Sequence, residues 1–160
     1  NGHLDSVECL TVQDGMIISG SVDSTIKIWD IESGRELHTL AGHQSTVNCL
    51  TVQDGMLFSG SIDHKIIIWD LTKGVDLQTL RGHQDSVMQL TLKDGILFSC
   101  SWDKTIKIWD IPSGKELHTL AGHQRPINCL TVQDGILVSG SDDSTIKIWD
   151  FNSDFDARSN

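Results

Sequence analysis

The sequence of 160 residues has no tyrosine, only two prolines and few aromatic side chains. A core built on large rings is therefore excluded, and Ile, Leu and Val must supply most of the buried surface. Positive charge is also scarce, with 12 Lys and Arg against 22 Asp and Glu, which gives a net charge of −10. Nucleic acids and anionic membranes attract basic patches, so we expect neither as a partner.

The sequence also lacks any apolar run long enough for a transmembrane helix, and no signal peptide is visible. It begins with Asn1 instead of Met, inside the opening motif of a repeat. We therefore expect a processed, excised or engineered chain, and leave open a targeting segment outside it.

Cysteine occurs at only four positions, and no pair has the Cys-x-x-Cys spacing of zinc and redox motifs. Three histidines, His38, His64 and His118, lack companions at the spacing of metal ligands. We predict no metal, no cofactor, and buried reduced thiols, which favour a cytoplasmic or nuclear protein. The four cysteines are Cys9, Cys49, Cys100 and Cys129.

A repeat with a period of 40 residues runs through the whole chain. The stretch Ser59–Asp70 recurs with small changes at Ser19–Asp30, Ser99–Asp110 and Ser139–Asp150. A period of about 40 to 45 residues that opens with Gly-His and closes with Trp-Asp is typical of a propeller blade.

Each period contains four short apolar or alternating runs, which predict strands. The dipeptide Asp54-Gly55 separates the first two runs of the second copy and is a strong hairpin signal. Lys27, Lys107 and Lys147 alternate with isoleucines in the third run, so we expect them to face outward. In the second copy the runs are Val47–Gln53, Met56–Ser61, Lys65–Asp70 and Asp76–Leu80.

The predicted fold class is all-β, with four antiparallel blades of four strands each. Residues 151–160 form a polar C-terminal tail or a weak outer strand, because Ala157 and Asn160 replace two leucines of the other copies. The predicted repeats are 2–41, 42–81, 82–121 and 122–150.

The residues Gly42-His43, Ser59, Asp63 and Trp69-Asp70 resemble the WD40-repeat family, and the resemblance covers nearly the whole chain. In that family a His, a Ser or Thr, an Asp and a Trp of each repeat form a hydrogen-bonded chain. The resemblance implies four such networks here. They are His3, Ser19, Asp23 and Trp29; His43, Ser59, Asp63 and Trp69; His83, Ser99, Asp103 and Trp109; and His123, Ser139, Asp143 and Trp149.

The His–Ser–Asp grouping also raises the hypothesis of a hydrolase. Four equal copies argue against it, because one site would be enough for catalysis. The serine also lies inside a strand and is followed by Gly or Cys, without a nucleophile-elbow motif. We therefore predict that the chain is not an enzyme.

The resemblance implies that a protein or peptide partner binds near the residue before each network aspartate. Apolar residues at such turn positions are candidates for an interface core, with Trp102 as the best anchor. The short turns resemble those of F-box and related ubiquitin-ligase adaptors, some of which read phosphopeptides with arginines at this position. Only Arg125 is basic on this side, which disfavours a phosphopeptide reader. The four positions are Val22, Ile62, Trp102 and Asp142.

Four blades raise a problem of closure, because WD40 rings usually contain seven or eight. We expect an open half-propeller with an apolar flank at each end. Two copies could form an eight-bladed homodimer, with Phe151–Asn160 reaching toward Asn1–His3 of the other copy; alternatively, further blades lie outside the chain. A compact four-bladed ring is a third outcome.

The predicted function is that of a non-enzymatic protein–protein interaction scaffold that assembles with a second copy of itself. The alternative is a fragment of a larger WD40 subunit that recruits substrates to a ubiquitin-ligase or kinase complex.

Overall fold

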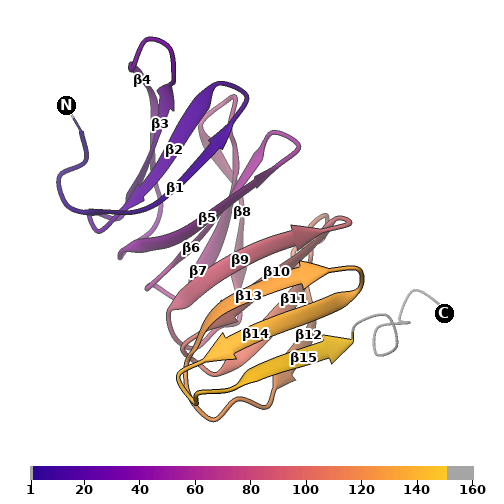
Figure 1. Cartoon of the computed structure of the whole chain (residues 1–160). Helices are drawn as coiled ribbons and strands as arrows, with labels where there is room; N and C mark the ends of the chain where they lie inside the picture. The colour runs from indigo at the N-terminus through magenta and orange to yellow at the C-terminus, as the bar shows by residue number, and fades with distance from the viewer. Residues whose placement is uncertain (1, 151–160) are drawn as a thin grey trace.

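Strands make up the regular structure of the chain. The computed structural model describes residues 2–150, which form fifteen strands and no helix (Figure 1). No helix in this range could cross a membrane. The strands form four separate antiparallel sheets, each with its strands side by side in chain order, as in a propeller blade. The all-β fold predicted from the repeat is confirmed.

Three blades have four strands, and the fourth blade has three among the described residues. The tail or weak outer strand expected at 151–160 lies outside the described residues. Blade 1 contains β1 (Val7–Gln13), β2 (Met16–Ser21), β3 (Thr25–Asp30) and β4 (Glu36–Ala41); blade 2 contains β5 (Val47–Gln53), β6 (Met56–Ser61), β7 (Lys65–Asp70) and β8 (Val75–Arg81); blade 3 contains β9 (Val87–Lys93), β10 (Ile96–Ser101), β11 (Thr105–Asp110) and β12 (Lys115–Ala121); blade 4 contains β13 (Ile127–Gln133), β14 (Ile136–Ser141) and β15 (Ile146–Asp150).

The strand boundaries follow from the turn residues. Asp54 and Gly55 both have positive φ, 51° and 74°, which a two-residue hairpin between right-twisted strands requires. The hairpin brings Gln53 opposite Met56 and sets the register of β5 against β6. β5, β6 and β7 have the predicted bounds, and β8 is one residue longer at each end than predicted.

The core lies between the blades. We call each interface between consecutive blades a seam; the face of a blade toward the next blade is its trailing face, and the opposite face is its leading face. In the first seam, Ile26 and Ile28 of blade 1 are buried in one cluster with Val47 and Trp69 of blade 2. The second and third seams use the same repeat positions. The innermost strands β1, β5, β9 and β13 contact one another in that order (Figure 1).

The expectation that the repeat lysines face outward is wrong for Lys107. This side chain is buried in the leading face of blade 3. Its Nζ donates hydrogen bonds to Glu116 Oε2 at 2.8 Å and Thr119 Oγ1 at 2.7 Å. Ile67, at the same repeat position in blade 2, is buried as well. The lysine and the isoleucines do lie on opposite faces of the strand, as the alternation predicted. Both faces of an inner blade lie against other blades, however, so neither face is open to water.

The two ends of the arc lack the neighbours that the inner blades have, so no four-bladed ring is formed (Figure 1). Ile146 and Ile148, on the trailing face of blade 4, are 73% and 71% exposed, whereas Ile66 and Ile68 at the same positions of blade 2 are at most 2% exposed. Leu10, on the leading face of blade 1, is 65% exposed. The sequence predicted these apolar flanks.

The cysteines differ from one another in burial. All four are free thiols, and Cys49 and Cys100 are buried as expected. Burial raises the pKa of Cys100 to about 12, and that of Cys9 to about 12. Cys9 is only partly buried and Cys129 is exposed, which contradicts the expectation that all four are buried; Cys129 shows the larger difference. It lies in the trailing face of blade 4, where no further blade covers it.

Candidate functional site

A hydrogen-bonded network joins His43, Ser59, Asp63 and Trp69 in blade 2. His43 Nδ1 lies 3.0 Å from Asp63 Oδ2, and His43 Nε2 lies 2.8 Å from Ser59 Oγ. The Trp69 indole N–H, which can only donate, donates to Ser59 Oγ at 2.8 Å. An ionised carboxylate can only accept, so Nδ1 donates to Asp63, and in the neutral imidazole Nε2 then accepts a hydrogen bond from the serine hydroxyl. Each of the four side chains is therefore satisfied by its neighbours.

The same network recurs in the other three blades. The distances between His Nδ1 and Asp Oδ2 are 3.0, 2.7 and 2.8 Å in blades 1, 3 and 4. The corresponding distances between His Nε2 and Ser Oγ are 2.7, 2.7 and 2.9 Å. The indole N–H donates to the serine at 3.0, 2.8 and 3.0 Å. The structure thus joins all sixteen residues that the resemblance assigned to networks, four to a blade.

The aspartate is the hub that ties two loops together. Asp63 Oδ2 also accepts the backbone N–H of Gln44 at 2.9 Å, and Oδ1 accepts that of Lys65 at 3.0 Å. Its own backbone N–H donates to Ser61 Oγ, whose hydroxyl donates to the carbonyl of Ser45 at 3.1 Å. The loop before β5 and the turn between β6 and β7 are thereby held in one arrangement.

These contacts determine the charge of the aspartates. Burial opposes ionisation of Asp63, but the hydrogen bonds from His43 and from the Gln44 backbone outweigh it and hold the pKa of Asp63 well below its usual range. Burial and the His83 hydrogen bond oppose each other in the same way at Asp103, whose pKa is also lowered. No buried side-chain nitrogen or oxygen in the described part of the chain lacks a hydrogen-bond partner.

The network loops present a row of variable side chains at the same end of the blades. At each position before the network aspartate, the backbone N–H donates to a carbonyl in the loop before the first strand of its blade, at 2.9 to 3.0 Å. Trp102 is 43% exposed and Ile62 is 38% exposed, while Asp142 is exposed and Val22 is half-buried. We call Ile62, Trp102 and Asp142 the loop face.

A hydrogen-bonded chain fixes the loop face across the third seam. The Trp102 indole N–H donates to Asn128 Oδ1 at 3.1 Å, and Asn128 Nδ2 donates to Asp142 Oδ1 at 2.5 Å. Trp102 is therefore held by its polar end while its ring stays accessible. Arg125 is exposed, and its carbonyl accepts the Ser141 hydroxyl at 3.0 Å.

The family with the description "WD domain, G-beta repeat" matches residues 1–30, 34–70, 74–110 and 114–150. The chain belongs to the WD40 family. The matched segments end on the Trp-Asp pair of each repeat and include every network residue named above.

Solved structures with the same fold include computationally designed proteins. The WD40 chain is 38% identical to the designed Ika4 protein, with a TM-score of 0.88 and coverage of 92% of both chains. It is 38% identical to the designed Ika8 protein, with a TM-score of 0.87 and coverage of 92% of this chain but 46% of that one. The RRP9 WD40 repeats are 31% identical, with a TM-score of 0.89 and coverage of 96% of this chain and 50% of that one.

Among curated proteins, similar segments occur in probable E3 ubiquitin ligase complex SCF subunits named sconB. Those of Penicillium rubens and Arthroderma benhamiae are each 54% identical over 39 residues, about one repeat. The match spans 24% of this chain and 6% of either relative. Together with the WD40 repeats, this supports a protein-interaction scaffold with protein partners.

The network serines are poorly placed for nucleophilic attack. All four are at most 3% exposed, and each hydroxyl oxygen already accepts the indole N–H. Among residues 2–150, no group of three His, Cys, Asp or Glu side chains could hold a metal ion.

Sequence reasoning missed Asn128, which positions two of the predicted partner-binding residues. The only signal was its recurrence: Asn48 occupies the same repeat position, and its Nδ2 donates to the carbonyl of Val87 at 3.1 Å across the second seam. A contact that crosses from one repeat to the next does not appear in a pattern read within one repeat.

Proposed function

We propose that this chain is a non-enzymatic protein-interaction scaffold that forms an eight-bladed ring from two copies. The observation that carries the proposal is the match between the two unpaired faces of the arc. The trailing face of blade 4 presents Ile146 and Ile148, at the positions that Ile26 and Ile28 occupy in the first seam. Burial of such surface is the main favourable term in association.

The leading face of blade 1 supplies the other half. Val7 and Leu10 stand where Val47 and Leu50 meet blade 1 in the first seam. Each copy therefore carries both halves of a seam, which makes the contact head-to-tail, and two such contacts close a ring. The coverage of about half of the Ika8 and RRP9 chains is consistent with an assembly of two copies.

Solution mass tests the ring directly. We expect light scattering to give twice the 17.7 kDa of one chain, and dilution to produce single copies that unfold at a lower urea concentration than the ring. A folded 17.7 kDa species that persists at all concentrations would contradict the proposal.

For the partner, we propose a protein or peptide that docks on the loop face with an apolar side chain against Trp102. Exposed tryptophans in rigid positions are enriched among residues that dominate binding energy. The net charge of −10 supports neither a nucleic acid nor a membrane as partner. The free thiols support a reducing location, the cytoplasm or the nucleus.

A peptide library selected on the protein tests the loop face. Peptides that bind there should lose affinity at least about thirtyfold with Trp102→Ala, since such anchors contribute about 2 kcal/mol or more. Leu77→Ala is the matched control, because Leu77 is similarly exposed but lies on the outer strand β8. Equal losses with both variants would contradict the assignment.

The alternative is that this segment is part of a larger WD40 subunit that recruits substrates to a ubiquitin ligase. The similarity to the sconB subunits over one repeat favours it. The genomic sequence flanking the segment decides between the two: an F-box or RING domain together with further repeats would support the alternative, and neither would be needed for the two-copy ring.

A further inference from the structure

The first two seams contain a contact between a glycine and a valine, and each end of the arc carries only one half of such a contact. In the first seam, a Cβ added to Gly20 would lie 2.7 Å from Val47 Cγ1. In the second seam, a Cβ added to Gly60 would lie 2.6 Å from Val87 Cγ1. Real carbon atoms do not approach so closely, so each valine fits against its glycine only because that residue has no side chain.

A cysteine completes this contact. Cys9 Sγ lies 3.4 Å from the carbonyl oxygen of Val47, and Cys49 Sγ lies 4.0 Å from that of Val87. The same sulfur atoms would lie 2.6 Å from the added Cβ atoms of Gly20 and Gly60. Glycine, cysteine and the next blade's valine thus form one interlocking unit at each of these two seams.

The third seam solves the same packing problem in another way. Cys100 stands at the glycine position, Gln89 at the cysteine position and Ile127 at the valine position. The thiol comes from the second strand of the blade, and Gln89 Oε1 instead accepts the backbone N–H of Leu130 at 2.9 Å. The chain therefore contains two kinds of seam.

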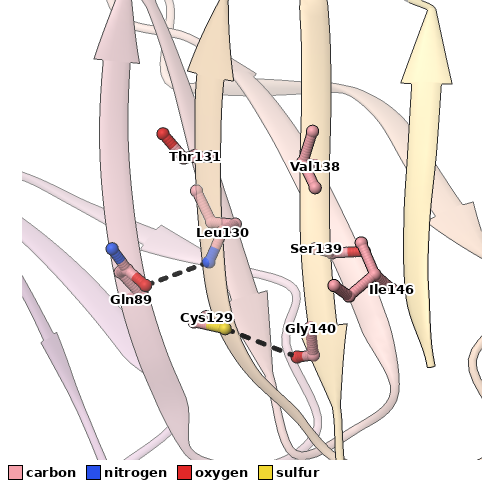
Figure 2. A pocket seen from close by; sticks show the side chains of 8 residues that line it. All are labelled: Gln89, Cys129, Leu130, Thr131, Val138, Ser139, Gly140 and Ile146. Atoms are coloured by element: carbon pink, nitrogen blue, oxygen red, sulfur yellow. Dashed lines mark hydrogen bonds between the residues drawn. The ribbon is translucent and has the colours of Figure 1, made fainter. Parts of the chain in front are cut away.

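Blade 4 carries the first kind of trailing face. Its residues are Gly140 and Cys129, and a Cβ added to Gly140 would meet only Cys129 Sγ, at 2.7 Å. Cys129, Gly140 and Ile146 line the same hollow in this face, and no part of the described chain fills it (Figure 2). Cys129 Sγ lies 3.9 Å from the carbonyl of Gly140, in its own blade. The valine of the unit is missing.

Blade 1 carries the matching valine. Val7 pairs with Ser21 beside a β-bulge, as Val47 pairs with Ser61. Val47 is fully buried, whereas Val7 is 49% exposed. This repeat position holds a valine at the two seams that use glycine and an isoleucine at the seam that uses Cys100, so Val7 matches the glycine kind of seam.

We propose that Val7 of a second copy packs against Gly140 and that its carbonyl accepts the Cys129 thiol. This proposal rests on the two-copy ring and assigns the residues that lock its closing contacts. The occupant is a second copy because both halves of the unit are on the same chain and are of the same kind.

We call the proposed contact of Val7 with Gly140 and Cys129 of the other copy the lock. Two complementary variants test it. Cys129→Ala/Gly140→Val places a side chain in the hollow, and Val7→Gly removes the valine. Because each ring has two closing contacts, the first variant alone is overpacked twice and the second alone loses two valines. We expect the dissociation constant of the dimer to rise at least about a hundredfold for the first and at least about tenfold for the second. Cys129→Ala alone is the control and should remain a dimer.

Mixing the two variants provides the decisive measurement. In a mixed ring, one contact joins blade 4 of the first variant, whose hollow contains the new valine side chain at position 140, to blade 1 of the second variant, which lacks the Val7 side chain. The added side chain then occupies the space that the Val7 side chain would fill. The other contact joins the two unaltered faces and is wild-type. Equimolar mixing should therefore restore a particle of twice the single-chain mass, which also shows that both variants fold. Failure of the mixture to assemble while the wild type does would overturn the lock.

The outcomes separate the lock from the ring. A wild-type dimer that the Gly140 substitution leaves intact overturns the lock but not the ring. A wild-type single copy overturns both, and a ladder of larger masses overturns the two-copy ring. Alkylation gives an independent readout: Cys129 should react more slowly in the wild-type dimer than in Val7→Gly, and equal rates would contradict its burial by a second copy.

Discussion

The inner seams and the end faces of this arc use nearly the same residues in opposite surroundings. Ile66 and Ile68 are buried between blades 2 and 3, while Ile146 and Ile148 stand in water at the same repeat positions. Trp69 is almost fully buried in the first seam, whereas Trp29, at the same repeat position on the leading face of blade 1, is only partly buried. The residue type is therefore not what decides burial in a repeat protein. The presence of a neighbouring blade decides it, and stability is a sum over seams.

The comparison predicts its largest effect for one substitution made in both places. Ile66→Ala should lower the free energy of unfolding by about 3 kcal/mol, because it leaves a cavity in a packed seam. Ile146→Ala should change it by less than about 0.5 kcal/mol when the chain is dilute and single. Urea unfolding measures both. If the chain closes with a second copy, the difference should shrink at high concentration.

The networks should show a smaller contrast. Asp63→Ala removes the acceptor of His43 and of two backbone N–H groups, so we expect a loss of about 2 kcal/mol in the free energy of unfolding. Asp143→Ala in the end blade should cost less, because its surroundings are more open to water. Thermal unfolding of the two variants provides the test. Equal losses of stability would show that burial of the inner network does not strengthen its contribution.

The network aspartates should also make the stability of the chain depend on pH. Their pKa is lowered in the folded chain, so between the folded and unfolded values the unfolded chain binds more protons, and stability rises with pH. The networks therefore contribute fully above about pH 4, and their contribution is lost as the pH falls below it. Urea midpoints between about pH 7 and about pH 3 should fall less steeply for Asp63→Asn. The turn variant Asp54→Asn, outside the networks, should follow the wild type.

The smallest effect should be the same inside and at the end. His64 and Ser144 both have positive φ, 68° and 67°, in the turn after the network aspartate. Glycine adopts this conformation without steric cost, so His64→Gly and Ser144→Gly should each stabilise the chain by about 0.5 kcal/mol. The strain lies in the backbone of a single turn residue, so it should not depend on whether a neighbouring blade is present. Unequal changes in the urea midpoint would mean that the turns also sense the seams.

Much of the fold could be predicted because its determinants lie within one repeat. Asp54-Gly55 fixes a turn, alternation fixes a strand, and the network residues lie within one period and meet as the resemblance implied. What depends on two repeats was not predicted: the burial of Lys107, the exposure of Cys129, and the contact of Trp102 with Asn128. A sequence pattern describes each repeat well and says little about which repeat stands beside it.

The contacts that join the blades, such as those of Asn48 with Val87 and Gln89 with Leu130, connect residues only about one repeat apart. Because these contacts join only neighbouring repeats, folding of an arc can begin at any blade. Unfolding can begin at either end of the arc and proceed one blade at a time. A closed circle has no free edge. In such a circle the first blade to open must break two seams at once, so separation of the copies and unfolding would become a single cooperative event.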